Sequence, residues 1–282
     1  MSTTTITPTS GTPASGTPTS GTPTAGARRT TYPPIPFGRI LGVELRKMFD
    51  TRSGFWLLMS IGILAVLASA AVVLFAPDEE IAYGSFAGAI GIPMSILLPV
   101  IAVLSVTGEW SQRSGLTTFT LVPSRGRVIA AKAVAAVGVG VAGMAVALAV
   151  GALGNVVGSQ LAGVPTQWDA TAANLGFIVL ASVLGQLMGF MLGVLVRNSP
   201  GAIVGYFVYA FIVPTLSGVL ASTQDWYRDV QQWVDFQYNQ TSLYDTVGLS
   251  GDEAAQLAVT AGLWLVLPML VGLWLVSRSE VK

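Results

Sequence analysis

GEWSQRSGLTTFTLVPSRGRVIAAK, residues 108–132, is the stretch around which this chain of 282 residues is organised. It lies between two long uncharged runs and carries four of the fourteen basic residues, namely Arg113, Arg125, Arg127 and Lys132. A compact basic segment between two runs of membrane-spanning length is typical of a cytoplasmic loop. Its length and amphipathic pattern also suit a helical hairpin that contacts a soluble partner.

Six runs without Asp, Glu, Lys or Arg flank this loop or lie farther along the chain. A helix rises about 1.5 Å per residue, so roughly 20 apolar residues cross a hydrocarbon core about 30 Å thick. These runs have no polar face, which argues against a soluble helical bundle. We therefore predict an all-α polytopic membrane protein. The predicted spans lie near 54–76, 86–106, 132–153, 175–196, 201–221 and 255–276.

Proline residues predict which spans are irregular. Pro93 and Pro99 each remove an intrahelical hydrogen bond from the second span, which we expect to be the least regular. Pro214 and Pro268 are expected to kink the fifth and sixth spans in the same way.

The basic residues predict the orientation of the chain. Thirteen of the fourteen fall in the N-terminal region, the 108–132 loop, the turn at Arg197 or the C-terminus, and only Arg228 falls in the alternate segments. Because Lys and Arg are retained on the cytoplasmic side, both termini are predicted to be cytoplasmic. The predicted location is the cell membrane, and the abundance of Gly and Ala favours a bacterial inner membrane.

The chain divides into three predicted regions. Residues 1–36 form a cytoplasmic tail rich in Thr, Pro, Ser and Gly, with four pentad repeats, and this composition predicts disorder. Residues 37–53 predict an amphipathic helix at the membrane surface. Residues 54–282 contain the six spans. Within the helix, Glu44 interrupts the apolar stripe, so we expect it to pair with Lys47 or with a basic residue of the 108–132 loop.

Residues 222–254 form the longest connection on the outer side. The sequence WYRDVQQWVDF within it places Trp226, Val230 and Trp233 on one helical face. Because Trp and Tyr favour the membrane–water interface, we predict a short helix at the outer leaflet. A loop packed over the bundle is the alternative.

Small residues predict close helix packing in the fourth span. Ala181, Gly185, Gly189 and Gly193 follow a strict four-residue spacing, which lets two backbones approach closely. Packing inside one subunit is favoured over a dimer seam. Gln186 is the main polar side chain of this span, and we expect it to hydrogen-bond a neighbouring helix rather than line a pathway.

The residues that are missing exclude several activities. The sequence has no Cys and no His, so it lacks thiols and the commonest general base and metal ligand. No catalytic, cofactor or metal site is predicted, and no nucleic acid is expected as a partner. None of the three lysines follows a glycine, so the chain has no phosphate-binding loop. The predicted spans hold no charged residue, which argues against an ion-driven carrier.

The sequence VELRKMFDTRSGFW, residues 43–56, is followed one span later by the 108–132 loop. Together they resemble the permease subunits of type 2 ATP-binding-cassette (ABC) exporters. The similar pattern is an acidic residue leaving the second span, a Gly-x-Thr step, a proline, and a basic residue before a lysine. Its positions here are Glu109, Gly115, Thr117, Pro123, Arg125 and Lys132. The Gly-Leu-Thr step departs from a plain Gly-Thr, which leaves the register of the loop helix open.

This resemblance implies two six-span subunits, as a homodimer or heterodimer, in the lipid bilayer. Two cytoplasmic ABC ATPase subunits would dock beneath them and bind ATP and Mg. The resemblance makes residues 37–53 a connecting helix, in which Glu44, Arg46 and Lys47 are the candidate residues, and makes the 108–132 loop a coupling helix. The residues that would contact the ATPase are Glu109, Arg113, Gly115, Thr117, Phe119, Pro123, Arg125 and Arg127.

The function implied is the transmembrane subunit of an ATP-driven exporter, without catalysis of its own. The uncharged spans favour an amphipathic or lipid-like cargo. A topology signal with contact to anionic lipid is the alternative role for the basic residues of the loop. A non-transporting scaffold or sensor and an ion-coupled secondary carrier are the alternative functions.

Overall fold

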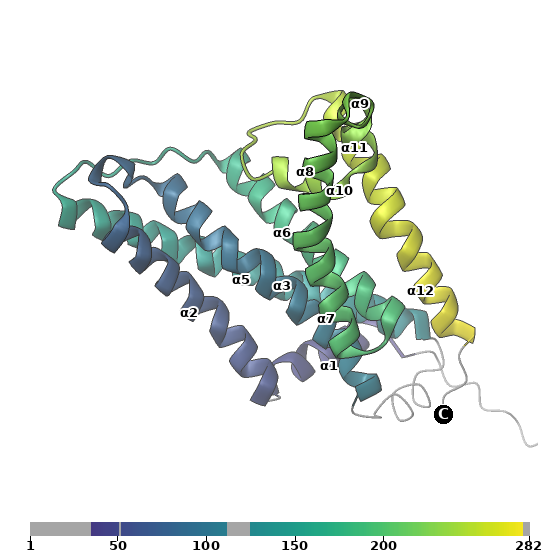
Figure 1. Ribbon diagram of the computed structural model, residues 1–282. Helices are drawn as coiled ribbons and strands as arrows, with labels where there is room; N and C mark the ends of the chain where they lie inside the picture. Colours follow the sequence, from purple (N-terminus) through teal and green to yellow (C-terminus); the bar gives the residue numbers. More distant parts are fainter. Residues whose placement is uncertain (1–34, 51, 112–124, 279–282) are drawn as a thin grey trace, which may run out of the picture. The chain divides into compact units, whose positions relative to one another are not determined.

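The computed structural model describes residues 35–50, 52–111 and 125–278, which belong to one structural unit. The tail predicted at residues 1–36 lies almost entirely outside these described residues. The helices, labelled in Figure 1, are α1 (Phe37–Asp50), α2 (Arg52–Phe75), α3 (Tyr83–Ser111), α5 (Arg125–Ala162), α6 (Ala172–Val196), α7 (Ser199–Phe207), α8 (Val213–Thr223), α9 (Asp225–Val234), α10 (Phe236–Ser242), α11 (Gly251–Ala261) and α12 (Leu267–Arg278). A short 3₁₀ helix, Asp78–Glu80, connects α2 and α3.

Within the described residues, six helical stretches are long and apolar enough to cross a bilayer, which confirms the all-α polytopic membrane fold. Many large apolar side chains on them are exposed, Leu74 at 71% and Phe75 at 83% among them. Such exposure is unfavourable in water and is satisfied by lipid. The six stretches are Gly54–Phe75, Tyr83–Gly108, Arg125–Ala162, Ala172–Val196, Ser199–Thr223 and Gly251–Arg278.

The helix that contains the third predicted span is much longer than that span. The expected boundaries were 132–153, whereas α5 runs for 38 residues from Arg125 to Ala162. At 1.5 Å per residue this helix is about 57 Å long, nearly twice the thickness of a hydrocarbon core. The prediction stopped at Lys132 because a charge normally ends a span. The helix continues because that charge is paired, as described below.

The prolines make the fifth and sixth spans irregular rather than the second, which was expected to be the least regular. α3 is α-helical without interruption from Tyr83 to Ser111, across both Pro93 and Pro99, so the expectation that this span is the least regular is wrong. Five-residue π-helical turns occur instead in the fifth and sixth spans, at Val208–Ile212 and Gly262–Val266. Each turn ends two residues before a proline. The wider π turn accommodates the carbonyl that proline leaves without a partner.

The small residues of α6 lie in a contact with α3. Ala181, Gly185, Gly189 and Gly193 are all buried within the chain. A Cβ built at Gly189 would lie 2.5 Å from the Pro99 carbonyl oxygen, which no side chain tolerates. On another face of α6, the Gln186 side-chain amide donates to the Ala136 carbonyl of α5 at 2.8 Å. Both observations place this helix at the centre of the packed unit.

The long connection between the fifth and sixth spans contains two helices. α9 (Asp225–Val234) exposes Trp226, Val230 and Trp233, as an amphipathic helix at an interface would. α10 (Phe236–Ser242) turns inward and is buried at Phe236 among α6, the π turns and α11. The sequence did not predict this second helix. In Figure 1 both lie at the end of the unit opposite α1.

Candidate functional site

The first site candidate begins with the amphipathic helix α1. Its buried residues are Ile40 and Glu44. An isolated carboxylate in such a position would be costly, because burial removes its hydration. A partner of opposite charge is therefore needed, and α5 provides it.

Glu44 forms two ion pairs. The Lys132 Nζ lies 2.5 Å from Glu44 Oε2, and the Lys47 Nζ lies 2.8 Å from Glu44 Oε1. The side chains of Glu44 and Lys132 are only 5% and 7% exposed, whereas that of Lys47 is 43% exposed. Both of the partners expected for Glu44 thus bind it, and the pair with Lys132 is the buried one.

The first two turns of α5 also contact two other parts of the chain. Arg125 donates to the Val276 carbonyl of α12 at 2.8 Å. Arg127 donates to the Ile35 carbonyl, just before α1, at 2.8 Å. Lys132 makes a longer contact, 3.4 Å, with the Ser105 carbonyl of α3. We name this set of contacts, from Arg125, Arg127 and Lys132 to their partners on α1, α3 and α12, the α5 clamp.

The clamp has an apolar surrounding that strengthens its ion pair. Val128 and Ile129, one turn before Lys132, are almost fully buried. Removing two ions from water costs several kcal/mol each, and the pair is retained only because its partners hold a close, hydrogen-bonded geometry. Such a pair contributes little net stability but fixes one arrangement of α1 against α5.

The clamp consists of ionic and hydrogen-bonding contacts. Its charged residues are two arginines, one lysine and one glutamate, and the acceptors are carboxylate or backbone carbonyl oxygens. In the described ranges, no group of acidic side chains is arranged to hold a metal ion. The clamp joins one long helix to three neighbours immediately after residues 112–124.

Only some of the predicted coupling residues can be located. Arg125 and Arg127 belong to the clamp, while Arg46 of α1 is exposed. The backbone of Glu109 belongs to the last turn of α3. The residues outside the described part of the chain are Arg113, Gly115, Thr117, Phe119 and Pro123.

The acceptors of the clamp could not be recognised from the residue types. Ser105, Val276 and Ile35 take part through backbone carbonyls, which every residue has. Only the buried carboxylate and its lysines were identifiable, because a charge within an apolar stripe requires a partner.

A second buried polar cluster surrounds α10 at the opposite end of the unit. Gln240 donates to the Ala181 carbonyl of α6 at 2.9 Å, and Asn239 donates to Thr260 Oγ1 of α11 at 3.1 Å. Ser217 of α8 donates to the buried carboxylate of Asp235. These contacts fix α10 among three helices. Asn239 itself is buried.

The fold and these two clusters define an all-α multi-pass membrane protein with a buried ionic site at one end. No model of a known protein family matches the chain, and no characterised protein matches it.

Proposed function

We propose that this chain is the transmembrane subunit of an ATP-driven ABC exporter in the cell membrane, with both termini in the cytoplasm. In this proposal residues 108–132 dock on a separate ATPase, which binds ATP and Mg. The chain itself contributes the substrate pathway and the helices that transmit movement of the ATPase to that pathway. A second permease subunit, identical or different, completes the pathway.

The buried pair between Glu44 and Lys132 is the observation that carries this proposal. A soluble ATPase moves a membrane bundle only if its contact surface is rigidly attached to the spans. The α5 clamp supports the proposal because it joins the start of α5, next to the proposed docking loop, to α1 and α12 through bonds of 2.5 and 2.8 Å. The resemblance of residues 43–56 and 108–132 to type 2 ABC permeases is the second support for this proposal.

The length of α5 supports the same proposal. A helix of 38 residues is longer than a bilayer needs, so part of it is available outside the hydrocarbon core. The part that carries Arg125 and Arg127 is the part next to the loop.

Affinity purification of the tagged full chain in mild detergent tests the proposal. We expect a soluble ATPase to co-purify in equal amount and to be lost when residues 111–127 are replaced by a Gly/Ser linker. The replaced chain must still insert, which protease accessibility measures. A chain lacking residues 1–30, a cytoplasmic change away from the loop, serves as the control and should keep the partner. Recovery of the intact chain alone, with candidate ATPases expressed, would contradict the proposal and favour a scaffold or carrier.

A further inference from the structure

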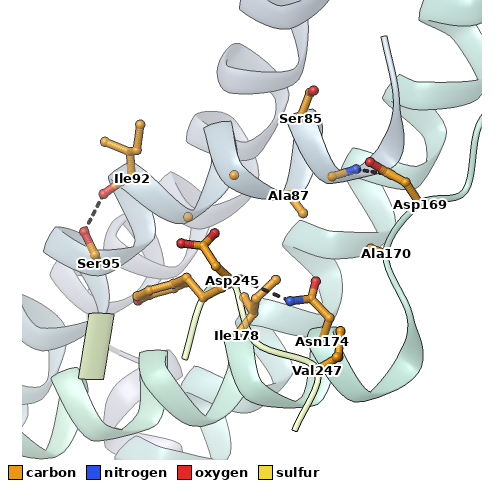
Figure 2. A pocket seen from close by; sticks show the side chains of 14 residues that line it. Ser85, Ala87, Ile92, Ser95, Asp169, Ala170, Asn174, Ile178, Asp245 and Val247 are labelled. Carbon is orange, nitrogen blue, oxygen red and sulfur yellow. Dashed lines mark hydrogen bonds between the residues drawn. The ribbon is translucent and has the colours of Figure 1, made fainter. Parts of the chain in front are cut away.

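A cavity of about 650 Å³ lies at the end of the unit opposite α1. Its walls come from four segments: α3 between Gly84 and Ser95, residues 169–170, the first two turns of α6, and residues 244–247. Figure 2 shows the side chains of Asp169, Asn174 and Asp245 around it. Its volume is in the range of small-molecule sites, about 300–1,000 Å³. We name it the α3–α6 cavity.

Specific contacts hold the walls of this cavity in place. The Gly84 N–H donates to Asp169 Oδ1 at 2.7 Å, and a Cβ at Gly84 would lie 2.7 Å from Asp169 Oδ2, so a larger residue there would displace the Asp169 side chain. Asn174 donates to the carbonyls of Tyr244 and Thr246, at 3.1 and 3.0 Å. The cavity is therefore built by tertiary bonds rather than left by a loose loop.

The wall that α3 presents is smooth and apolar. Gly88 and Gly91 lie on it one turn apart, and a Cβ built at Gly88 would meet no atom within 4 Å. Ala87, Ile92 and Ile178 add apolar surface. A hydrocarbon group fits against such a wall.

The polar groups of the cavity are almost all acceptors. Ser85 and Ser95 donate their hydroxyl protons to the carbonyls of Glu80 and Ile92, at 2.7 and 2.8 Å. Both side-chain N–H groups of Asn174 are used as described above, which leaves its Oδ1 as an acceptor. These polar groups complement a ligand that carries hydrogen-bond donors.

Both charged side chains that line the cavity are negative. Asp169 and Asp245 both line it, and neither forms an ion pair with any described residue. Arg228, the one basic residue in the connecting segments at this end, is paired with Asp225 at 2.5 Å. Burial raises the pKa of the Tyr244 phenol above its usual value of 10.0, so this group stays neutral and acts as an aromatic face beside the carboxylates.

We propose that the α3–α6 cavity binds an amphiphile with a protonated amine. The ammonium group donates to one of the two carboxylates, Asp169 or Asp245, which lie on opposite sides of the cavity in Figure 2, and the hydrocarbon part lies on the glycine wall of α3. Charge-assisted hydrogen bonds of this kind are stronger than neutral ones. This site belongs to the chain alone and does not depend on the proposed transport function.

Equilibrium dialysis with the full chain in phosphatidylcholine nanodiscs tests the proposal, with binding to empty nanodiscs subtracted. The probes are n-octylammonium, n-octyltrimethylammonium and n-octyl sulfate, which share one chain length. We expect saturable binding of n-octylammonium at one site per chain, weaker binding of the trimethylated cation, which has no N–H donor, and no saturable binding of the sulfate. Equal binding of the three probes, or no saturable binding of n-octylammonium, would overturn the proposal.

Matched variants locate the site. Asp169→Asn or Asp245→Asn, whichever removes the carboxylate that the ammonium group contacts, should weaken n-octylammonium binding about fivefold, the value of an exposed ion pair. Asp252→Asn removes the same charge on α11 away from the cavity and should leave binding unchanged. Gly88→Leu should abolish binding by filling the cavity, with Gly88→Ala as the conservative control for folding. If both aspartate variants bind like the unaltered chain, the assignment is wrong even where Gly88→Leu fails to fold.

Discussion

The buried pair of Glu44 and Lys132 gives the sharpest prediction about stability. Coulomb's law with an effective dielectric constant of about 20 gives an attraction of ~7 kcal/mol at their separation of 2.5 Å. Desolvation of two nearly buried ions offsets most of this. Removal of one partner leaves the other ion buried, so Lys132→Met or Glu44→Met should each lower the free energy of unfolding by about 3–5 kcal/mol.

The double variant Glu44→Met with Lys132→Met should cost at least ~3 kcal/mol less than the sum of its single variants, because no buried charge remains. Lys47→Met is the matched control. Lys47 is 43% exposed, so its loss should cost less than about 1 kcal/mol. Unfolding by dodecyl sulfate in mixed micelles, followed by tryptophan fluorescence, measures all four. Equal costs for Lys132→Met and Lys47→Met would refute the reasoning that burial decides the strength of the pair.

Two further predictions concern helix packing and capping. Gly189→Ala should destabilise the chain by roughly 1–3 kcal/mol, because the added Cβ would press on the Pro99 carbonyl. Gly138→Ala is the matched control. Its Cβ would meet open space, so this variant should be neutral or stabilising by up to about 1 kcal/mol. Equal unfolding midpoints for the two variants would show that α3 and α6 separate easily. Ser250→Ala removes the capping box of α11 and should cost about 1 kcal/mol, with faster hydrogen exchange at the Glu253 amide. Ser222→Ala, which loses only a bond to the Val219 carbonyl, is its control, and unchanged exchange in Ser250→Ala would exclude a capping role.

Part of the candidate site was predictable from local patterns. Glu44 stood out because a carboxylate in an apolar stripe needs a cation, and its two candidate partners followed from spacing and from the nearby basic loop. The contacts of Arg125 and Arg127 were not predictable in the same way. Their acceptors are backbone carbonyls of Val276 and Ile35, 151 and 92 residues away in sequence. Every residue has a backbone carbonyl, so the residue type does not identify an acceptor.

The helix boundaries were likewise predictable in part. A span was predicted to end at Lys132 because charge is costly in hydrocarbon, yet α5 continues to Arg125 because that charge is paired. The prolines were assigned the right chemical effect but the wrong order of importance. Whether a missing hydrogen bond produces a π turn depends on the neighbouring helices as well as on the proline.

The sequence by itself determined the fold class, since six apolar runs of spanning length have no soluble arrangement that buries them. It also determined α1 and the contrast between a basic and an acidic end, because hydropathy and charge are properties of single residues. Only the tertiary structure decided which face of α6 meets α3, that α10 turns inward, and that an acceptor-lined cavity forms between Gly88 and Asp245. These features depend on distances between segments that lie far apart in the chain, and no local pattern specifies such distances.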